Sequence, residues 1–354
     1  MSLALLPAPP TGFRPAIATE AELARYGFPP RPPHAAGARI GRMWAETFER
    51  DAPFTVAQLA KASYLVSQPR QPSIVNGDNS ENWSGVVVRY RAGDPINLAI
   101  AGTWNVPSLA SAGAGTQLIG IWIGLDGSAA DTLGLSQAGI AGSIDASGTA
   151  SYFAWSEWLS AADPIQPAQP ISNFPIAAGD VIEIQIWVTS STTASVVMQK
   201  LSSASRGALV VVPLIAPSGV RVVGNDAEWI VERPKVGGSA ENPVFATLPS
   251  YSTVNFTHAA AWSQSAGNIS MSPASFGSFA LRLGFAAPVS ARAVAASLDF
   301  TPPISLQEMM SETAVMFAGF GETLAMEENG TLVSVANNQG LDAFRCDYVG
   351  PAAQ

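Results

Sequence analysis

Two glutamates lie close together in one strand-like stretch, NDAEWIVERP, at residues 225–234. Apolar residues such as Trp229 favour an extended strand, and Pro234 ends the run. Because side chains alternate between the two faces of a strand, Glu228 and Glu232 should share one face, opposite to Trp229. Burying a carboxylate without a partner costs roughly several kcal/mol, so acids in an apolar strand usually have a partner or a function.

Two further stretches place polar groups within strand-like sequence. Gln137 lies in LGLSQAGI, and Glu157 lies between Trp155 and Trp158 in SYFAWSEWL. Each group has two readings. It is either the solvent-facing position of a half-exposed strand or a buried group with a chemical role.

The composition excludes several classes of function. Apolar residues make up 47% of the 354 residues, charged residues only 13%, and the net charge is −9. An acidic, charge-poor surface argues against nucleic acid and anionic membranes as partners. The single cysteine, Cys346, cannot form an intramolecular disulfide or a thiolate metal cluster. His34 and His258 lie far apart, and neither accompanies a nucleophile motif, so we expect no histidine-based catalysis, no metal and no cofactor.

The sequence pattern from Asn82 to about Ala260 is typical of β-structure. Short runs of Val, Ile, Trp, Tyr and Thr alternate with Gly, Ser, Asn, Asp and Pro, which is typical of antiparallel sandwiches and barrels. We therefore predict one β domain over residues 77–354. Residues 265–340 fit this pattern less well and are expected to contain an insertion of unknown role, with a helix after Ser305 and a strand pair at the end of the chain.

Residues 1–76 differ from the rest. They are proline-rich, and Thr19 with Glu22 forms a capping box before a short helix. Their net charge is +3, whereas that of residues 77–354 is −12. We predict an irregular pro-segment that covers the functional site at neutral pH and is released in acid, when the carboxylates of the body become neutral. The alternative is an extension that stays packed on the body through side chains such as Trp44.

The motifs of the β region resemble, in order and over about 180 residues, those of the glutamic peptidases (eqolisins). The strongest similarity is to the Asn-x-Ala-Glu-Trp-Ile-Val-Glu motif of that family. The matching stretches are NWSG at 82–85, WNVPS at 104–108, IWIGLDG at 121–127, SQAG at 136–139, YFAWSEW at 152–158, FPIAAGDVI at 174–182 and NDAEWIVER at 225–233.

The resemblance implies an all-β fold, an antiparallel sandwich of two sheets like that of concanavalin A and the glucanases. It also implies an acid endopeptidase acting on polypeptides, with Glu232 and Gln137 as the catalytic pair. Phe153 and Leu159 depart from the family pattern at positions that bear on substrate preference. Residues expected to line the substrate site are Trp83, Trp122, Asp126, Trp155 and Glu157.

Further expectations follow from the same resemblance. The lack of the disulfides found in fungal members indicates a bacterial type. Secretion is expected, although MSLALLPAPP at the start does not read as a signal peptide. The oligomeric state is open, with a monomer favoured.

The chemistry of amide hydrolysis suits such a pair. An ionised Glu232 can take a proton from water, and the amide of Gln137 can donate a hydrogen bond to the developing oxyanion. The protonated glutamate can then supply the leaving amine. Neighbouring carboxyl groups would couple to this titration and favour activity in acid.

Two alternatives remain open at the level of the sequence. The same fold hosts sugar-binding proteins and glycosidases, which a tryptophan-rich site with two carboxylates would suit. The discriminating residue is Gln137, since a glycosidase needs a second acid there. An inactive relative of the peptidases is the other alternative.

Overall fold

The computed structural model describes residues 7–31, 38–49, 54–60, 74–76, 79–89, 96–113, 115, 117–127, 134–160, 168–201, 207, 209–224, 226–238, 243–264, 320–328, 331–338 and 344–350. The helix expected after Ser305 lies outside these residues. None of the helices in the described part of the chain is long and apolar enough to cross a lipid bilayer.

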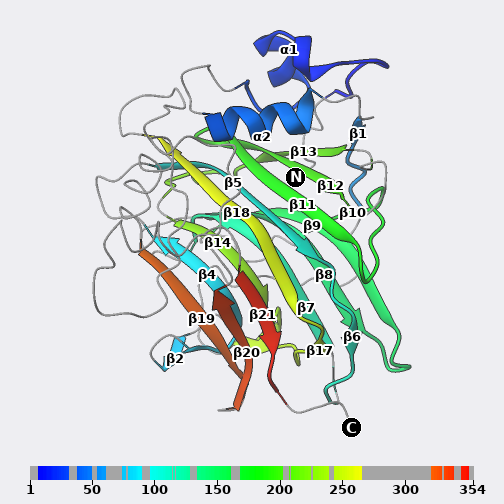
Figure 1. Ribbon diagram of the computed structural model, residues 1–354, viewed down its shortest axis with the longest axis vertical. Helices are drawn as coiled ribbons and strands as arrows, with labels where there is room; N and C mark the ends of the chain where they lie inside the picture. Colours follow the sequence, from blue (N-terminus) through cyan, green and yellow to red (C-terminus); the bar gives the residue numbers. More distant parts are fainter. Residues whose placement is uncertain are drawn as a thin grey trace.

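Two β-sheets, here named sheet A and sheet B, pack face to face and form the body of the molecule, so the predicted all-β sandwich is confirmed (Figure 1). In the order that follows, neighbouring strands of sheet A are antiparallel except for the first pair. In spatial order, sheet A contains β1 (Phe54–Val56), β13 (Leu209–Ile215), β12 (Thr193–Lys200), β11 (Val181–Ser190), β5 (Ile96–Asn105), β18 (Val254–Gln264), β21 (Phe344–Tyr348), β20 (Thr331–Asn338) and β19 (Phe320–Glu328).

Sheet B carries all three stretches that attracted attention in the sequence. Its strands are antiparallel throughout, and it ends on β19, which pairs with β4 in sheet B and with β20 in sheet A. In spatial order, sheet B contains β10 (Gln169–Ile171), β9 (Ala150–Ser160), β8 (Gly134–Ile144), β7 (Gln117–Leu125), β14 (Asp226–Glu232), β4 (Trp83–Arg89) and β19.

Short elements complete the described structure. The helices belong to the N-terminal segment, and the short strands pair with one another, except that one of them also pairs in parallel with β19. They are the 3₁₀ helix η1 (Pro15–Ile17), α1 (Glu20–Arg25), α2 (Ala38–Phe48), and the strands β2 (Ile74–Asn76), β3 (Asn79–Ser80), β6 (Leu109–Ala110), β15 (Lys235–Gly238), β16 (Pro243–Phe245) and β17 (Ser250–Tyr251).

The core lies between the two sheets and follows from side-chain alternation. In β11, Ile182, Ile184 and Ile186 point into the core and are fully buried, while Glu183 and Gln185 lie on the other face. Trp229 of sheet B enters the same core, and its indole N–H donates to the Ala101 carbonyl of sheet A at 2.9 Å. This indole therefore satisfies its only polar group while joining the sheets.

The N-terminal segment packs on the outer face of sheet A, which is the face turned away from the core. Figure 1 shows α1 and α2 at the upper end of the view, beside β5, β11 and β13. Leu23, Phe28, Trp44 and Phe48 of the segment are buried there. Their apolar partners on the sheet are Ala99, Ala101, Trp187, Val197, Leu209, Val211 and Ala260.

The local sequence signals of the N-terminal segment predicted α1 correctly but did not predict α2. The capping box of α1 forms, with the Thr19 hydroxyl accepting from the Glu22 amide and the Glu22 carboxylate accepting from the Thr19 amide at 2.8 Å. Gly27 follows α1 with a left-handed φ of 75°. Helix α2 was not predicted, because its isolated stretch is short and derives its stability from docking Trp44 and Phe48 on the sheet.

The expected insertion at residues 265–340 stays a prediction, because residues 265–319 lie outside the described residues. Its last part, residues 320–338, forms β19 and β20, which belong to the sheets. The predicted strand pair near the C-terminus is confirmed by the antiparallel register of β20 and β21, in which Ala336 lies opposite Cys346.

Candidate active site

Strand β14 presents Glu228 and Glu232 on the same face, as its alternation predicts. Its neighbours are in register on both sides, so Glu232 lies opposite Trp83 of β4 and Gly120 of β7. Trp229 points into the core on the other side. The two glutamates therefore lie on the outer face of sheet B, on the far side of the core from sheet A.

Glu232 is held by two indole groups. The Trp122 Nε1–H donates to its Oε2 at 2.7 Å, and the Trp83 Nε1–H donates to its Oε1 at 3.1 Å. The two indole rings meet edge to face with centroids 5.1 Å apart. All three side chains are fully buried. Both carboxyl oxygens therefore accept a hydrogen bond from a neutral donor.

Glycines on β7 and β8 leave the space that the Trp122 side chain occupies. A Cβ at Gly124 would lie 2.9 Å from Trp122 Cζ3, and a Cβ at Gly120 would lie 3.5 Å from Trp122 Cδ1. The indole thus lies along its own strand, over the two glycines that flank it at i−2 and i+2. On the next strand, a Cβ at Gly139 would lie 2.5 Å from the Trp122 Cβ. The backbone beneath the ring therefore needs glycine at positions 124 and 139, where a Cβ would collide with Trp122.

Gln137 and Glu157 form a second polar contact on the same face. They lie opposite each other on β8 and β9, and Gln137 also lies opposite Gly124 of β7. The Gln137 Nε2 donates to Glu157 Oε2 at 3.0 Å. Gln137 Oε1 and Glu157 Oε1 are buried and have no hydrogen-bond partner among the described residues. One amide N–H of Gln137 is thus engaged, while its carbonyl and one carboxyl oxygen remain free to bind another group.

Burial dominates the titration of both glutamates. It raises the pKa of Glu232 to about 8, although the hydrogen bonds from Trp122 and Trp83 lower it. Burial also raises the pKa of Glu157 well above its usual range; the hydrogen bond from Gln137 lowers it, and the charge of Glu232 raises it further. The two carboxyl groups therefore influence each other, and the ionisation of one disfavours the ionisation of the other.

The other predicted site residues fall into two groups. Trp155 joins Trp83 and Trp122 in one buried cluster on this face, and Phe153 packs against it. Asp126 belongs elsewhere: its carboxylate accepts from the backbone amides of Val223 at 2.8 Å and Gly224 at 2.6 Å. Its left-handed φ of 66° places it in the turn after β7. Asp126 thus anchors a loop.

Sequence reasoning missed the glycines of the site. The signal was present in GIWIG, where Gly120 and Gly124 flank Trp122 at the spacing that shares a face. Glycine inside a strand often marks a close approach of other atoms. In the described part of the chain, no group of three or more His, Cys, Asp or Glu side chains is arranged to hold a metal ion.

Fold and site together define a β-sandwich protein with a buried glutamate and a glutamine on the outer face of one sheet. Residues 81–280, more than half of the chain, match the profile of the Peptidase A4 family. The chain therefore belongs to this family, the glutamic peptidases or eqolisins, and the predicted family is confirmed.

Individual relatives agree with this assignment. Scytalidopepsin B of Scytalidium lignicola is 29% identical over 150 residues, which are 42% of this chain and 51% of that protein. Aspergillopepsin-2 of Aspergillus niger is 26% identical over 206 residues, 53% of this chain and 66% of that protein. The chain thus matches between about half and two thirds of the length of these relatives.

A solved structure supports the fold. Scytalido-glutamic peptidase, crystallised with a transition state analog inhibitor, superposes with a TM-score of 0.50 at 22% identity. The match covers 76% of this chain and 98% of that one.

Stability should fall as pH rises from about 4.5 through about 8. A carboxyl whose pKa is raised by folding binds more protons in the folded than in the unfolded state over this range, so its ionisation favours unfolding. Glu232 and Glu157 act in this direction, and the effect should be on the order of a few kcal/mol. Chemical unfolding at several pH values measures it.

The matched variant for this test is Glu232→Gln, which has no titrating group at that position. Its free energy of unfolding should be lower in acid, because the amide nitrogen cannot accept from an indole N–H. The informative quantity is the slope against pH, which should become shallower than in the wild type. An unchanged slope would show that Glu232 does not titrate in this range.

Gly124→Ala should destabilise the fold by about 1–3 kcal/mol, as overpacking does. The new methyl would lie 2.8 Å from Leu135 Cδ1 and 2.9 Å from Trp122 Cζ3. Gly120→Ala is the matched control, because its methyl would meet nothing closer than 3.5 Å. Denaturant unfolding of both variants measures the difference, and equal stabilities would contradict the placement of the Trp122 indole.

Proposed function

We propose that this protein is an acid endopeptidase that hydrolyses peptide bonds of polypeptides, with Glu232 as general base and Gln137 as oxyanion donor. The observation that carries the proposal is the setting of Glu232. It is a fully buried carboxyl held by two neutral indole donors, on the same sheet face as Gln137, in a chain of the Peptidase A4 family.

The indole donors suit a proton-transfer role. A buried carboxylate paired with a cation would have a lowered pKa and would be a weak base. The two N–H groups orient the carboxyl group and leave its pKa at about 8. A water bound between Glu232 and the scissile carbonyl would hydrate the carboxylate and donate to it, which favours the ionised form during attack. Glu232 then takes a proton from this water.

Gln137 is suited to the second task. Its amide is fixed by the bond to Glu157, so it need not be oriented during the reaction. The second N–H of the same nitrogen can donate to the oxyanion as the carbonyl becomes tetrahedral. Protonated Glu232 finally returns its proton to the leaving nitrogen. The bond that breaks is the scissile C–N bond, and water supplies both the hydroxyl and the hydrogen.

The coupled carboxyl groups account for a preference for acid. In acid, Glu157 keeps its proton, so Glu232 is the one carboxyl group of this pair that has to be ionised when the water attacks. As pH rises, ionisation of both groups would place two anions on one buried face. We therefore expect the loss of activity on the alkaline side to reflect the pair rather than one residue.

Substrate contacts are assigned to the apolar surroundings of this pair. Trp83, Trp122 and Trp155 offer aromatic surface for substrate side chains, and Glu157 acts through Gln137. Asp126 would shape the site through the loop at Val223 and Gly224. Secretion, expected from the family resemblance, fits an enzyme that works in acid. The glycosidase alternative loses support, because the chain belongs to a peptidase family.

Glu232→Gln should abolish peptidase activity, with a loss of ~10²–10⁴ or more, because no general base remains. Fragments released from a denatured protein in moderately acidic buffer, followed by mass spectrometry, measure it. Glu46→Gln, at an exposed position of α2, is the control and should keep full activity. Wild-type turnover in a folded Glu232→Gln protein would overturn the role of this residue.

Gln137→Ala should lower kcat by a factor on the order of 10²–10³ with a smaller change in KM, since an oxyanion donor acts mainly in the transition state. Gln185→Ala is the control: it removes another buried glutamine, on the outer face of sheet A, and should reduce stability without reducing kcat. A silent Gln137→Ala change, or a change confined to KM, would contradict the oxyanion role.

A further inference from the structure

The N-terminal segment bears directly on how this protein responds to acid. Its net positive charge led to the prediction of a pro-segment that is released when the carboxylates of the body become neutral, and this release stays a prediction. The described part of the segment, residues 7–31, 38–49 and 54–60, makes contacts of another kind. We propose that these residues are a permanent third layer of the folded protein, docked on the outer face of sheet A and retained in acid.

Apolar burial provides most of the contact. Trp44, Phe48 and Leu23 are at most 1% exposed, and they pack against a face of sheet A that includes the fully buried Trp187. Without the segment, this face would expose one large contiguous apolar patch, which soluble monomers rarely do. Apolar burial does not depend on the protonation of carboxylates, so falling pH leaves it intact.

The polar bonds between segment and sheet are also neutral. The Ser195 hydroxyl donates to the Gly27 carbonyl, and the Gln185 amide donates to the Thr47 hydroxyl at 3.0 Å. Ser195 and Gln185 are buried on the sheet face. None of these groups titrates between neutral pH and moderate acid.

Residues 54–60 join both sheets at one edge of the sandwich. Strand β1 pairs in parallel with β13 of sheet A. A few residues later, the amide of Ser172 donates to the Gln58 carbonyl at 2.8 Å, and the amide of Ala60 donates to the Pro170 carbonyl at 2.8 Å, both beside β10 of sheet B. Asn173 adds two side-chain bonds, to the Val56 carbonyl and from the Gln58 amide. All of these bonds are backbone or amide bonds that acid does not remove.

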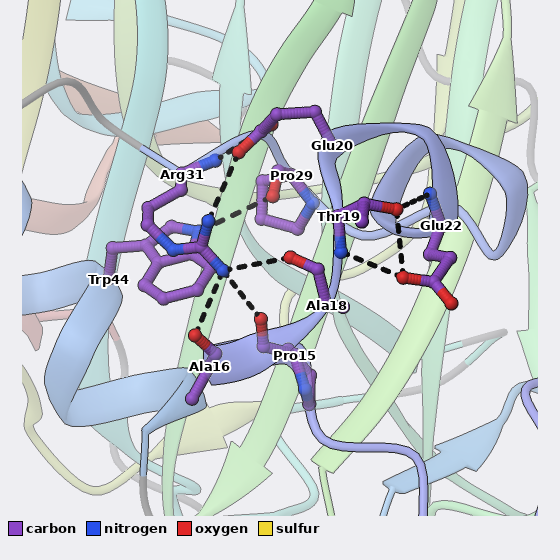
Figure 2. A network of polar contacts seen from close by, with 9 residues as sticks. All are labelled: Pro15, Ala16, Ala18, Thr19, Glu20, Glu22, Pro29, Arg31 and Trp44. Carbon is purple, nitrogen blue, oxygen red and sulfur yellow. Dashed lines mark hydrogen bonds and ion pairs between the residues drawn. The ribbon is translucent and has the colours of Figure 1, made fainter.

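A single cation organises the interior of the segment (Figure 2). The Arg31 Nη2 donates to the carbonyls of Pro15, Ala16 and Ala18 at 2.9–3.1 Å. The guanidinium lies over the Trp44 ring at 5.1 Å, and the Trp44 indole donates to the Pro29 carbonyl at 3.3 Å. Arg31 stays charged at any pH of interest, so this arrangement persists in acid.

Among the described residues, the ion pairs on these elements lie either within the segment or within the sandwich. The pair of Arg31 with Glu20, at 3.4 Å, lies within the segment, and Glu22 caps its own helix. On the sheet, Glu183 accepts from the amides of Gln185 and Gln199. Other titratable groups on these elements are Arg14, Arg25, Tyr26, Glu46, Glu49, His258 and Lys200, of which Lys200 pairs with Asp180 at 2.7 Å.

Trp44→Ala in the full chain tests the proposal. If the layer is permanent, the variant should lower the urea midpoint of the β-sandwich by roughly 1 M, and by the same amount at pH 7 and at pH 4. If the segment is released in acid, the loss should be present at pH 7 and absent at pH 4. Far-UV circular dichroism follows the sandwich in both cases.

Ile17→Ala is the matched control, since Ile17 belongs to the same segment and is 77% exposed. It should leave both midpoints unchanged. Trp44→Phe serves if Trp44→Ala does not fold; it keeps an aromatic ring but loses the indole N–H that donates to the Pro29 carbonyl. A smaller loss, again equal at the two pH values, would support the permanent layer. A loss confined to pH 7 in either variant would overturn it.

Discussion

The burial of the Glu232 carboxyl beneath two indole N–H groups is the constraint on which the site depends. A carboxyl in such a place has no bulk water to stabilise its charge, so its pKa rises to about 8. Trp83 and Trp122 satisfy both oxygens without neutralising the group. A cation in their place would hold the carboxylate ionised and lower its pKa.

The backbone of sheet B is adapted to this arrangement. The Trp122 indole reaches Glu232 by lying along its own strand, which requires glycine at position 124 and, on the next strand, at position 139. Strand β7, with Gly120 opposite Glu232 and Gly124 opposite Gln137, separates Glu232 from the Gln137–Glu157 pair. A side chain at position 124 or 139 would collide with Trp122, so these strands give up side-chain packing to seat the indole.

Acid is a favourable medium for this molecule for two separate reasons. Its buried carboxyl groups prefer to be protonated, so folding and low pH support each other. The N-terminal segment is joined to sheet A by apolar contacts and neutral hydrogen bonds, which acid does not weaken. A low content of charged residues, 13% of the chain, is consistent with both features, because few paired charges are available to be disrupted.

The sequence alone determined the properties that depend on local spacing. Alternation in β14 placed Glu228 and Glu232 on one face, the capping box placed α1, and the ordered motifs indicated the family and the two-sheet fold. Tertiary structure decided what depends on strand register. Glu232 meets Trp83 and Trp122 across 149 and 110 residues of chain, and nothing local specifies those contacts. It also turned Asp126 toward the backbone of a loop and docked α2 on sheet A, because the partners of both come from distant segments that only the folded chain brings together.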